Sequence, residues 1–160
     1  LTTPEGKREW AINTATIPSN LEDAFLVIGF SGETSPTGRM VAKVAKLISN
    51  NPEMISEMES ISRITTAGLT ALSAGNLEGL GLAMDACHER LRILEVSTPK
   101  LDQMVEAAKT HSLGSKLTGA GGGGCMVSLT NNPSRVAEAI EISGGSPLIT
   151  RLGAEGVRAI

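Results

Sequence analysis

The chain has 160 residues, of which 41% are hydrophobic, and a net charge of −3 at pH 7. This length suits one domain with its own core, or a piece of a larger protein. Charges of both signs are mixed and only Trp10, Phe25 and Phe30 are aromatic, which excludes a basic or base-stacking surface for nucleic acids. No apolar run approaches the ~18 residues of a membrane span. Two distant cysteines, Cys87 and Cys125, indicate a reducing, cytoplasmic setting and neither a zinc site nor a disulfide framework.

The first 30 residues predict two strands. Residues 9–16 alternate weakly and are typical of an edge strand, whereas residues 24–30 form a continuous apolar run that indicates a strand buried on both faces. The start, Leu1-Thr2-Thr3, is not a natural initiation sequence, and we expect a chain cut from a longer protein. Residues 1–24 are therefore interpreted as the end of a preceding domain or a linker, and residues 25–160 as the domain itself.

Four helices are predicted next, each with apolar residues recurring every three or four positions. The first follows a polar loop over residues 31–37, where Ser35 caps the helix and Pro36 takes its first position. Threonines and Gly68 weaken the middle of the second helix. The expected helices run from Pro36 to Asn50, from Pro52 to Ala74, from Leu77 to Leu94 and from Pro99 to His111.

The last third of the chain returns to strands around a run of glycines. Residues 115–118 lead into the run, residues 125–129 form the next strand, and a short helix begins at Pro133. A strand over residues 147–152 and a tail strand over residues 157–160 complete the pattern. Together these elements predict an α+β fold, in which a small, mostly antiparallel sheet has helices packed on one face.

The glycine run, Gly119 to Gly124, holds five glycines and one alanine in six positions. Each glycine costs roughly 0.5–1 kcal/mol in an ordered segment, so such a run needs a reason. Bare successive N–H groups can form a concavity for a phosphate, although neither the Walker nor the dinucleotide spacing is present. The spacing supports a phosphate cradle and a structural hairpin equally. Lys116 either pairs with that phosphate or points outward from its strand.

Other polar candidates have simpler interpretations. His88 with Asp85 is typical of a surface pair on a helix flank, and Cys125 and Cys87 are typical of core thiols. Core packing also explains Met54, Met58 and Met84. The hydroxyls of residues 32–37 are open to two readings, a helix cap or a contact with a hydroxyl or anionic ligand.

Three segments carry a resemblance to a known family. The run from Ser115 to Cys125, Ser-Lys-Leu-Thr-Gly-Ala-Gly-Gly-Gly-Gly-Cys, resembles the third signature motif of the galactokinase, homoserine kinase, mevalonate kinase and phosphomevalonate kinase superfamily. Residues 94–102 resemble the Leu-Gly-Val-Ser-Thr-Pro-x-Leu-Asp passage of archaeal-type mevalonate kinases. Residues 32–44 resemble the family segment with Thr-x-x-x-Val-Ala-x-Val, in which Thr37 holds the threonine position.

The resemblance implies the ferredoxin-like C-terminal domain of a kinase that transfers the γ-phosphoryl group of ATP, with Mg, to the 5-hydroxyl of mevalonate. It places Gly119, Ala120, Gly121, Gly122 and Gly123 beside substrate and the ATP phosphates, because backbone N–H groups can stabilise a transferring phosphoryl group. It places Thr37 on the substrate side. The oligomeric state is left open between a monomer and a homodimer.

Parts of the family pattern are missing from these residues. The ATP-gripping Pro-x-x-x-Gly-Leu-Gly-Ser-Ser-Ala motif is absent from the sequence, and none of Asp23, Asp85 and Asp102 matches the family's catalytic aspartate. We therefore expect the N-terminal domain to be missing, no catalytic residue or metal ligand within this chain, and no phosphorylation of mevalonate by the chain alone. Two alternatives remain: another kinase of the superfamily, acting on phosphomevalonate or a sugar, and a non-catalytic binding or regulatory domain.

Overall fold

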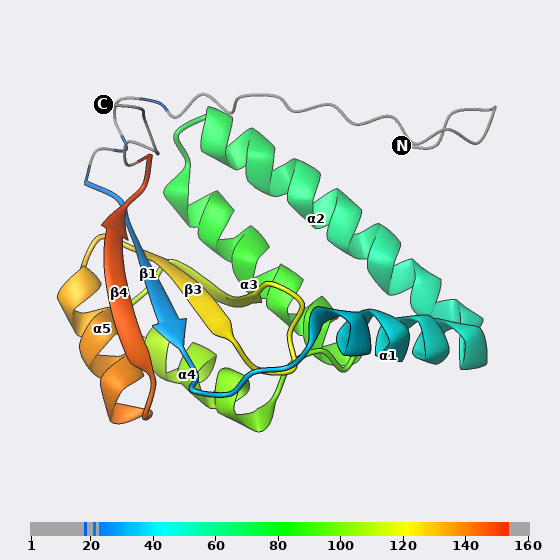
Figure 1. Cartoon of the computed structure of the whole chain (residues 1–160). Helices are drawn as coiled ribbons and strands as arrows, with labels where there is room; N and C mark the ends of the chain where they lie inside the picture. The colour runs from blue at the N-terminus through cyan, green and yellow to red at the C-terminus, as the bar shows by residue number, and fades with distance from the viewer. Residues whose placement is uncertain (1–17, 19–20, 22, 154–160) are drawn as a thin grey trace, which may run out of the picture.

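The computed structural model describes residues 18, 21 and 23–153 (Figure 1). The strands expected over residues 9–16 and 157–160 lie outside them. None of the described helices combines the length and apolarity of a membrane crossing. The elements, in chain order, are β1 (Phe25–Phe30), α1 (Thr37–Asn50), the 3-10 turn η2 (Pro52–Met54), α2 (Ile55–Ser73), α3 (Leu77–Ile93), α4 (Pro99–Lys109), β2 (Gly114–Thr118), β3 (Cys125–Thr130), α5 (Pro133–Ile142) and β4 (Ser146–Arg151).

The four strands form one antiparallel sheet in the order β2-β3-β1-β4. Helices connect β1 to β2 and β3 to β4, while the glycine run joins β2 directly to β3. This is the strand order of the ferredoxin-like fold. The predicted α+β class and the antiparallel sheet are confirmed.

One face of the sheet packs against α4 and α5, which lie side by side behind it in Figure 1. The apolar stripe predicted for the fourth helix points into this core. The same holds for the short helix after β3, whose Val136 and Ile140 are fully buried. The sheet contributes Val27, Leu117 and Met126 to this cluster, and α4 contributes Leu101, Met104, Val105 and Ala108.

The opposite face of the sheet is less completely covered. Successive side chains of a strand point to opposite faces of the sheet. Since Val27 packs in the core with α4 and α5, Leu26, Ile28 and Phe30 point away from these helices. The first two are half-buried and Phe30 is 40% exposed. The expectation that this strand is buried on both faces was therefore wrong, because among the described residues helices cover β1 on one side only along much of its length.

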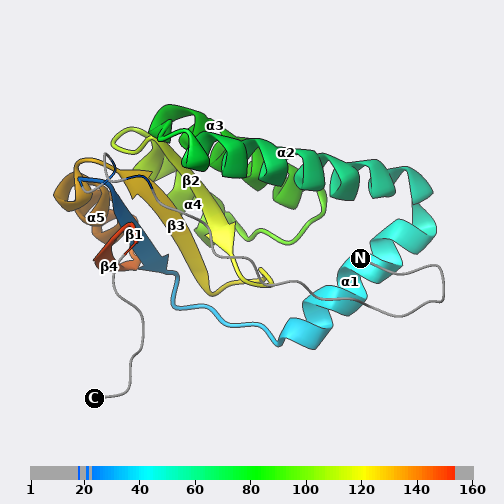
Figure 2. The same cartoon turned by 90° about the horizontal axis from the view of Figure 1, so that it is seen from above.

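Helices α2 and α3 form a hairpin beside β2 (Figure 2). Gly81 on α3 and Gly114 on β2 approach so closely that a Cβ on either would overlap the backbone of the facing segment. Leucines and Met84 of the hairpin pack around Leu129 at this end of the sheet. The hairpin thus covers the β2 edge, and the close approach brings polar side chains of α3 within reach of that strand's backbone.

Helix α1 projects away from the sheet in both views (Figures 1 and 2). It begins at Thr37 with Pro36 at the cap position and no side-chain capping bond, so the predicted Ser35 cap was wrong. Met40 is the one buried residue of its predicted stripe, and Val41 is 63% exposed. The stripe predicted for the second helix is also largely exposed, at Ile55, Met58 and Leu69. Periodicity identified these faces correctly as apolar, but α1 and the outer side of α2 have little of the described chain to pack against.

Candidate functional site

A cleft of about 410 Å³ opens where the glycine run meets the connection between β1 and α1. The two segments are some 85 residues apart in sequence, and antiparallel pairing of β1 with β3 brings them together. The cleft is lined by Thr34, Ser35, Thr37, Thr118, Gly119, Ala120, Gly121, Gly123, Gly124 and Cys125.

The glycine loop is a packed structure. A Cβ at Gly121 would overlap the carbonyl oxygen of Val96, and one at Gly122 would lie 2.5 Å from Met40 Sδ. All five glycines from Gly119 to Gly124 have positive φ, between +71° and +122°. The loop therefore needs glycine partly for backbone conformation and partly because neighbouring segments press against it.

Hydrogen bonds fasten the loop at two places. The Gly124 N–H donates to the Glu33 carbonyl at 2.7 Å, and the Gly124 carbonyl accepts from the Ser31 N–H at 2.9 Å. The Gly122 N–H donates to the Val96 carbonyl at 2.8 Å. One side of the loop is thereby tied to the chain leaving β1, and the other to the connection between α3 and α4.

The remaining amides of the loop form no hydrogen bond within the described residues. Within the described part of the chain, no acceptor takes the N–H groups of Gly119, Ala120, Gly121 or Gly123, and all four residues line the cleft. Unpaired amides on a loop with left-handed backbone form a concavity that suits an anion. The structure thus places five of the predicted site residues, these four and Thr37, on one cleft, whereas Gly122 is not part of its lining.

Hydroxyl groups make up much of the remaining lining. Thr34, Ser35 and Thr37 come from the loop before α1 and the start of that helix, and Thr118 closes the end of β2. The sequence had singled out the loop before α1 but not Thr118, whose signal was its position next to the glycine run. Since the positive end of a helix dipole lies at its N-terminus, the first turn of α1 adds to the cleft's preference for an anion.

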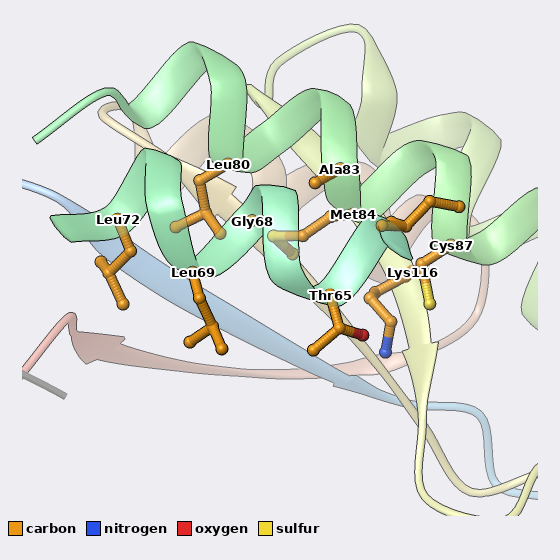
Figure 3. Close-up of a pocket in the computed structure, with 10 residues that line it drawn as sticks. Thr65, Gly68, Leu69, Leu72, Leu80, Ala83, Met84, Cys87 and Lys116 are labelled. Carbon is orange, nitrogen blue, oxygen red and sulfur yellow. The ribbon is translucent and has the colours of Figure 1, made fainter. Parts of the chain in front are cut away.

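The described lining of the cleft includes no charged side chain. Lys116 points to the other side of β2, where its Nζ donates to the Leu117 carbonyl at 2.7 Å and lines an apolar pocket of about 200 Å³ between α2 and α3 (Figure 3). Of the two readings of Lys116, the structure favours the outward one. No cluster of three or more His, Cys, Asp or Glu side chains suited to a metal ion occurs in the described ranges.

The two cysteines differ from the core thiols that were expected. Both are half-buried: Cys125 lines the cleft at the start of β3, and Cys87 lines the apolar pocket with Lys116 (Figure 3). Cys125 is only half-buried because it lies at the end of β3 that borders the cleft.

His88 also departs from expectation, because it is 1% exposed and is no surface residue. Its Nδ1 accepts the Leu117 N–H of β2 at 3.3 Å, while Asp85 accepts the Ser115 N–H of the same strand at 2.7 Å. A sheet-edge strand presents every second amide outward, and α3 supplies acceptors for two of these. Burial lowers the pKa of His88 below its ordinary value of about 6.5, opposed by the nearby Asp102 and Glu89 carboxylates.

The chain is similar in sequence to a known family of kinases. Residues 69–142 match the family model described as "GHMP kinases C terminal". Among curated proteins, the mevalonate kinase of Pyrococcus furiosus is 39% identical over 141 residues, which cover 83% of this chain and 42% of that protein. The mevalonate kinase of Methanocaldococcus jannaschii is 38% identical over 107 residues, covering 67% of this chain and 32% of that protein.

Solved structures show the same similarity. The mevalonate kinase of L. major in complex with R-mevalonate superimposes with a TM-score of 0.75 at 25% identity, over 82% of this chain and 44% of that one. The mevalonate kinase of Methanococcus jannaschii gives a TM-score of 0.67 at 31% identity, over 82% of this chain and 40% of that one. The chain thus spans less than half the length of the relatives that it matches.

Proposed function

Because the chain carries a GHMP kinase C-terminal domain, we propose that it is part of a mevalonate kinase, an enzyme that transfers the γ-phosphoryl group of ATP to the 5-hydroxyl of mevalonate. The observation that carries this proposal is the row of unpaired glycine-loop amides on the cleft, in a chain whose relatives are named mevalonate kinases. The domain proper is residues 25–160, and residues 1–24 belong to the preceding domain or a linker.

The role proposed for the cleft is binding and charge stabilisation. Phosphoryl transfer requires positioned donors around the transferring group more than covalent chemistry by the protein. The amides of Gly119, Ala120, Gly121 and Gly123 would donate to phosphate oxygens. The Thr37 hydroxyl, at the start of α1, would donate to substrate. Gly122 would act indirectly, through its hydrogen bond to Val96.

The proton of the attacking hydroxyl needs an acceptor that this cleft does not supply. Its described lining has no carboxylate and no ammonium group, so the residues present also do not fit a Mg²⁺ site. The general base and the ligands of any metal ion are therefore assigned to the part of the enzyme outside this chain. An N-terminal domain is the partner that the proposal requires, and the free cysteines support a cytoplasmic setting.

Nucleotide titration of the 160-residue chain tests the cleft. In ¹H–¹⁵N spectra, ATP is expected to shift the amides of Gly119, Ala120, Gly121 and Gly123 more than those of Gly122 and Gly124, which are bonded within the chain. Equal shifts along the loop, or none at millimolar ATP, would count against a phosphate cradle.

A coupled assay tests the reaction. The chain alone is expected to be inactive, and the longer protein that contains it should phosphorylate mevalonate in preference to phosphomevalonate, homoserine and galactose. A preference for one of the other three would replace the substrate assignment but keep the kinase. Turnover by the isolated chain near that of a full-length enzyme would refute the assignment of the base to another domain.

A further inference from the structure

Two segments of the chain outside the cleft support the glycine loop. The first is the connection between α3 and α4, where the Val96 carbonyl holds the Gly122 N–H and touches Gly121. The second is β2, which leads directly into Gly119. A shift of either support would move the amides that face the cleft.

The carboxylate of Asp102 on α4 contacts the first support, where the Glu33 carboxylate also accepts a hydrogen bond, from Thr98. The Ser97 hydroxyl, one residue after Val96, donates to Asp102 Oδ1 at 2.5 Å, and Arg92 Nε lies 3.3 Å from Asp102 Oδ2. Ser97 belongs to the connection between α3 and α4, and Arg92 lies near the end of α3. Asp102 therefore fixes the segment that carries the Val96 carbonyl.

The same carboxylate reaches the second support through His88. Asp102 Oδ1 lies 3.3 Å from His88 Nε2. Since His88 Nδ1 accepts the Leu117 N–H, the proton of the neutral ring sits on Nε2 and faces Asp102. Leu117 is fully buried and lies two residues before Gly119, so Asp102 orients the ring that holds the last buried residue of β2.

We infer that Asp102 is a positioning residue for the glycine loop, acting through Ser97 on one support and through His88 on the other. It does not line the cleft, so its effect on the reaction comes through where the loop amides lie. This inference rests on the proposed function only for its kinetic consequence; the effect on the loop stands without it.

The first experiment uses the 160-residue chain and does not depend on any reaction. Asp102→Asn keeps the size of the side chain but removes its charge, and Ser97→Ala removes one donor to it. Both are expected to shift the amide resonances of Gly119 to Gly124 and to raise the hydrogen exchange of the two bonded amides, those of Gly122 and Gly124, at least ~tenfold. Glu106→Gln, on the exposed side of the same helix, is the matched control and should leave the loop unchanged.

The second experiment uses the longer enzyme. Asp102→Asn is expected to lower kcat/KM for ATP by about ten- to a hundredfold, since small misplacements of binding groups have effects of that size. Its KM for mevalonate should change less than twofold. Ser97→Ala should give a smaller loss, and the double variant should be no worse than Asp102→Asn, because both changes break one network.

The two experiments separate the two claims. If Asp102→Asn is folded and its loop amides match the unsubstituted chain, the positioning role is wrong whatever the enzyme does. If the unsubstituted enzyme phosphorylates none of the four substrates, the proposed function fails, and the loop amides alone decide the role of Asp102. Should Asp102→Asn not fold, Ser97→Ala decides by the same criterion.

Discussion

Replacing Gly121 by alanine tests whether the glycine loop is held by packing. Gly121 has a φ of +79°, and a Cβ there would overlap the Val96 carbonyl oxygen. The left-handed backbone alone costs an alanine about 1–2 kcal/mol. Relief of the overlap requires the loop to move from Val96, which also weakens the hydrogen bond from Gly122, worth ~0.5–1.5 kcal/mol. We expect Gly121→Ala to lower the free energy of unfolding by about 2–4 kcal/mol in total.

Gly119→Ala provides the matched control. Gly119 has nearly the same φ, +82°, but no atom lies within 4 Å of a Cβ placed there. Its substitution should therefore cost only the backbone contribution, about 1–2 kcal/mol. Urea unfolding of the 160-residue chain, followed by circular dichroism, measures both values. Equal losses for the two variants would refute the claim that contact with Val96 shapes the loop.

Three further predictions follow from buried groups and from the cleft. The pKa of His88 is lowered in the folded chain, so as the pH falls the unfolded chain binds a proton at His88 before the folded chain does. Stability should therefore be fully present above pH ~6.5 and decline below it, and His88→Gln should flatten that decline in urea titrations. Met104→Ala should cost about 2–5 kcal/mol because Met104 is fully buried between α4 and the sheet, whereas Met58→Ala, at a site 46% exposed, should cost under ~1 kcal/mol by the same method. ATP should slow the alkylation of Cys125, which lines the cleft, but not that of Cys87. Mass spectrometry of the labelled peptides measures both rates, and an equal effect of ATP on the two cysteines would contradict nucleotide binding in the cleft.

Sequence periodicity predicted those helices best that lie on the sheet. The apolar stripe of α4 is buried throughout, at Leu101, Met104, Val105 and Ala108, because the sheet offers a surface wide enough to cover it. The same kind of pattern in α1 and α2 gave the right helices and a wrong burial, as Val41 and Met58 show. Amphipathic spacing reports which face is apolar, while burial depends on a neighbour that may be distant in sequence.

The spacing of the glycine run left a choice between a phosphate cradle and a structural turn, and only the family resemblance favoured the cradle. The structure contains features of both: Gly122 and Gly124 donate their amides to Val96 and Glu33, and the residues with unpaired loop amides line the cleft. Spacing could not divide the six positions, because the division depends on Val96 and Glu33, which are remote in sequence. His88 was misjudged for the same reason, since its partner Leu117 is 29 residues away on another element.

The α3 side chains that accept hydrogen bonds from β2 have a second consequence, for association between molecules. An exposed edge strand offers its free amides to any other extended chain, and this is a common start of aggregation. Here Asp85 occupies the outward amide of Ser115 and His88 that of Leu117. The residues that steady the strand before the glycine loop thus also protect the β2 edge from pairing with a foreign strand during folding and at high concentration.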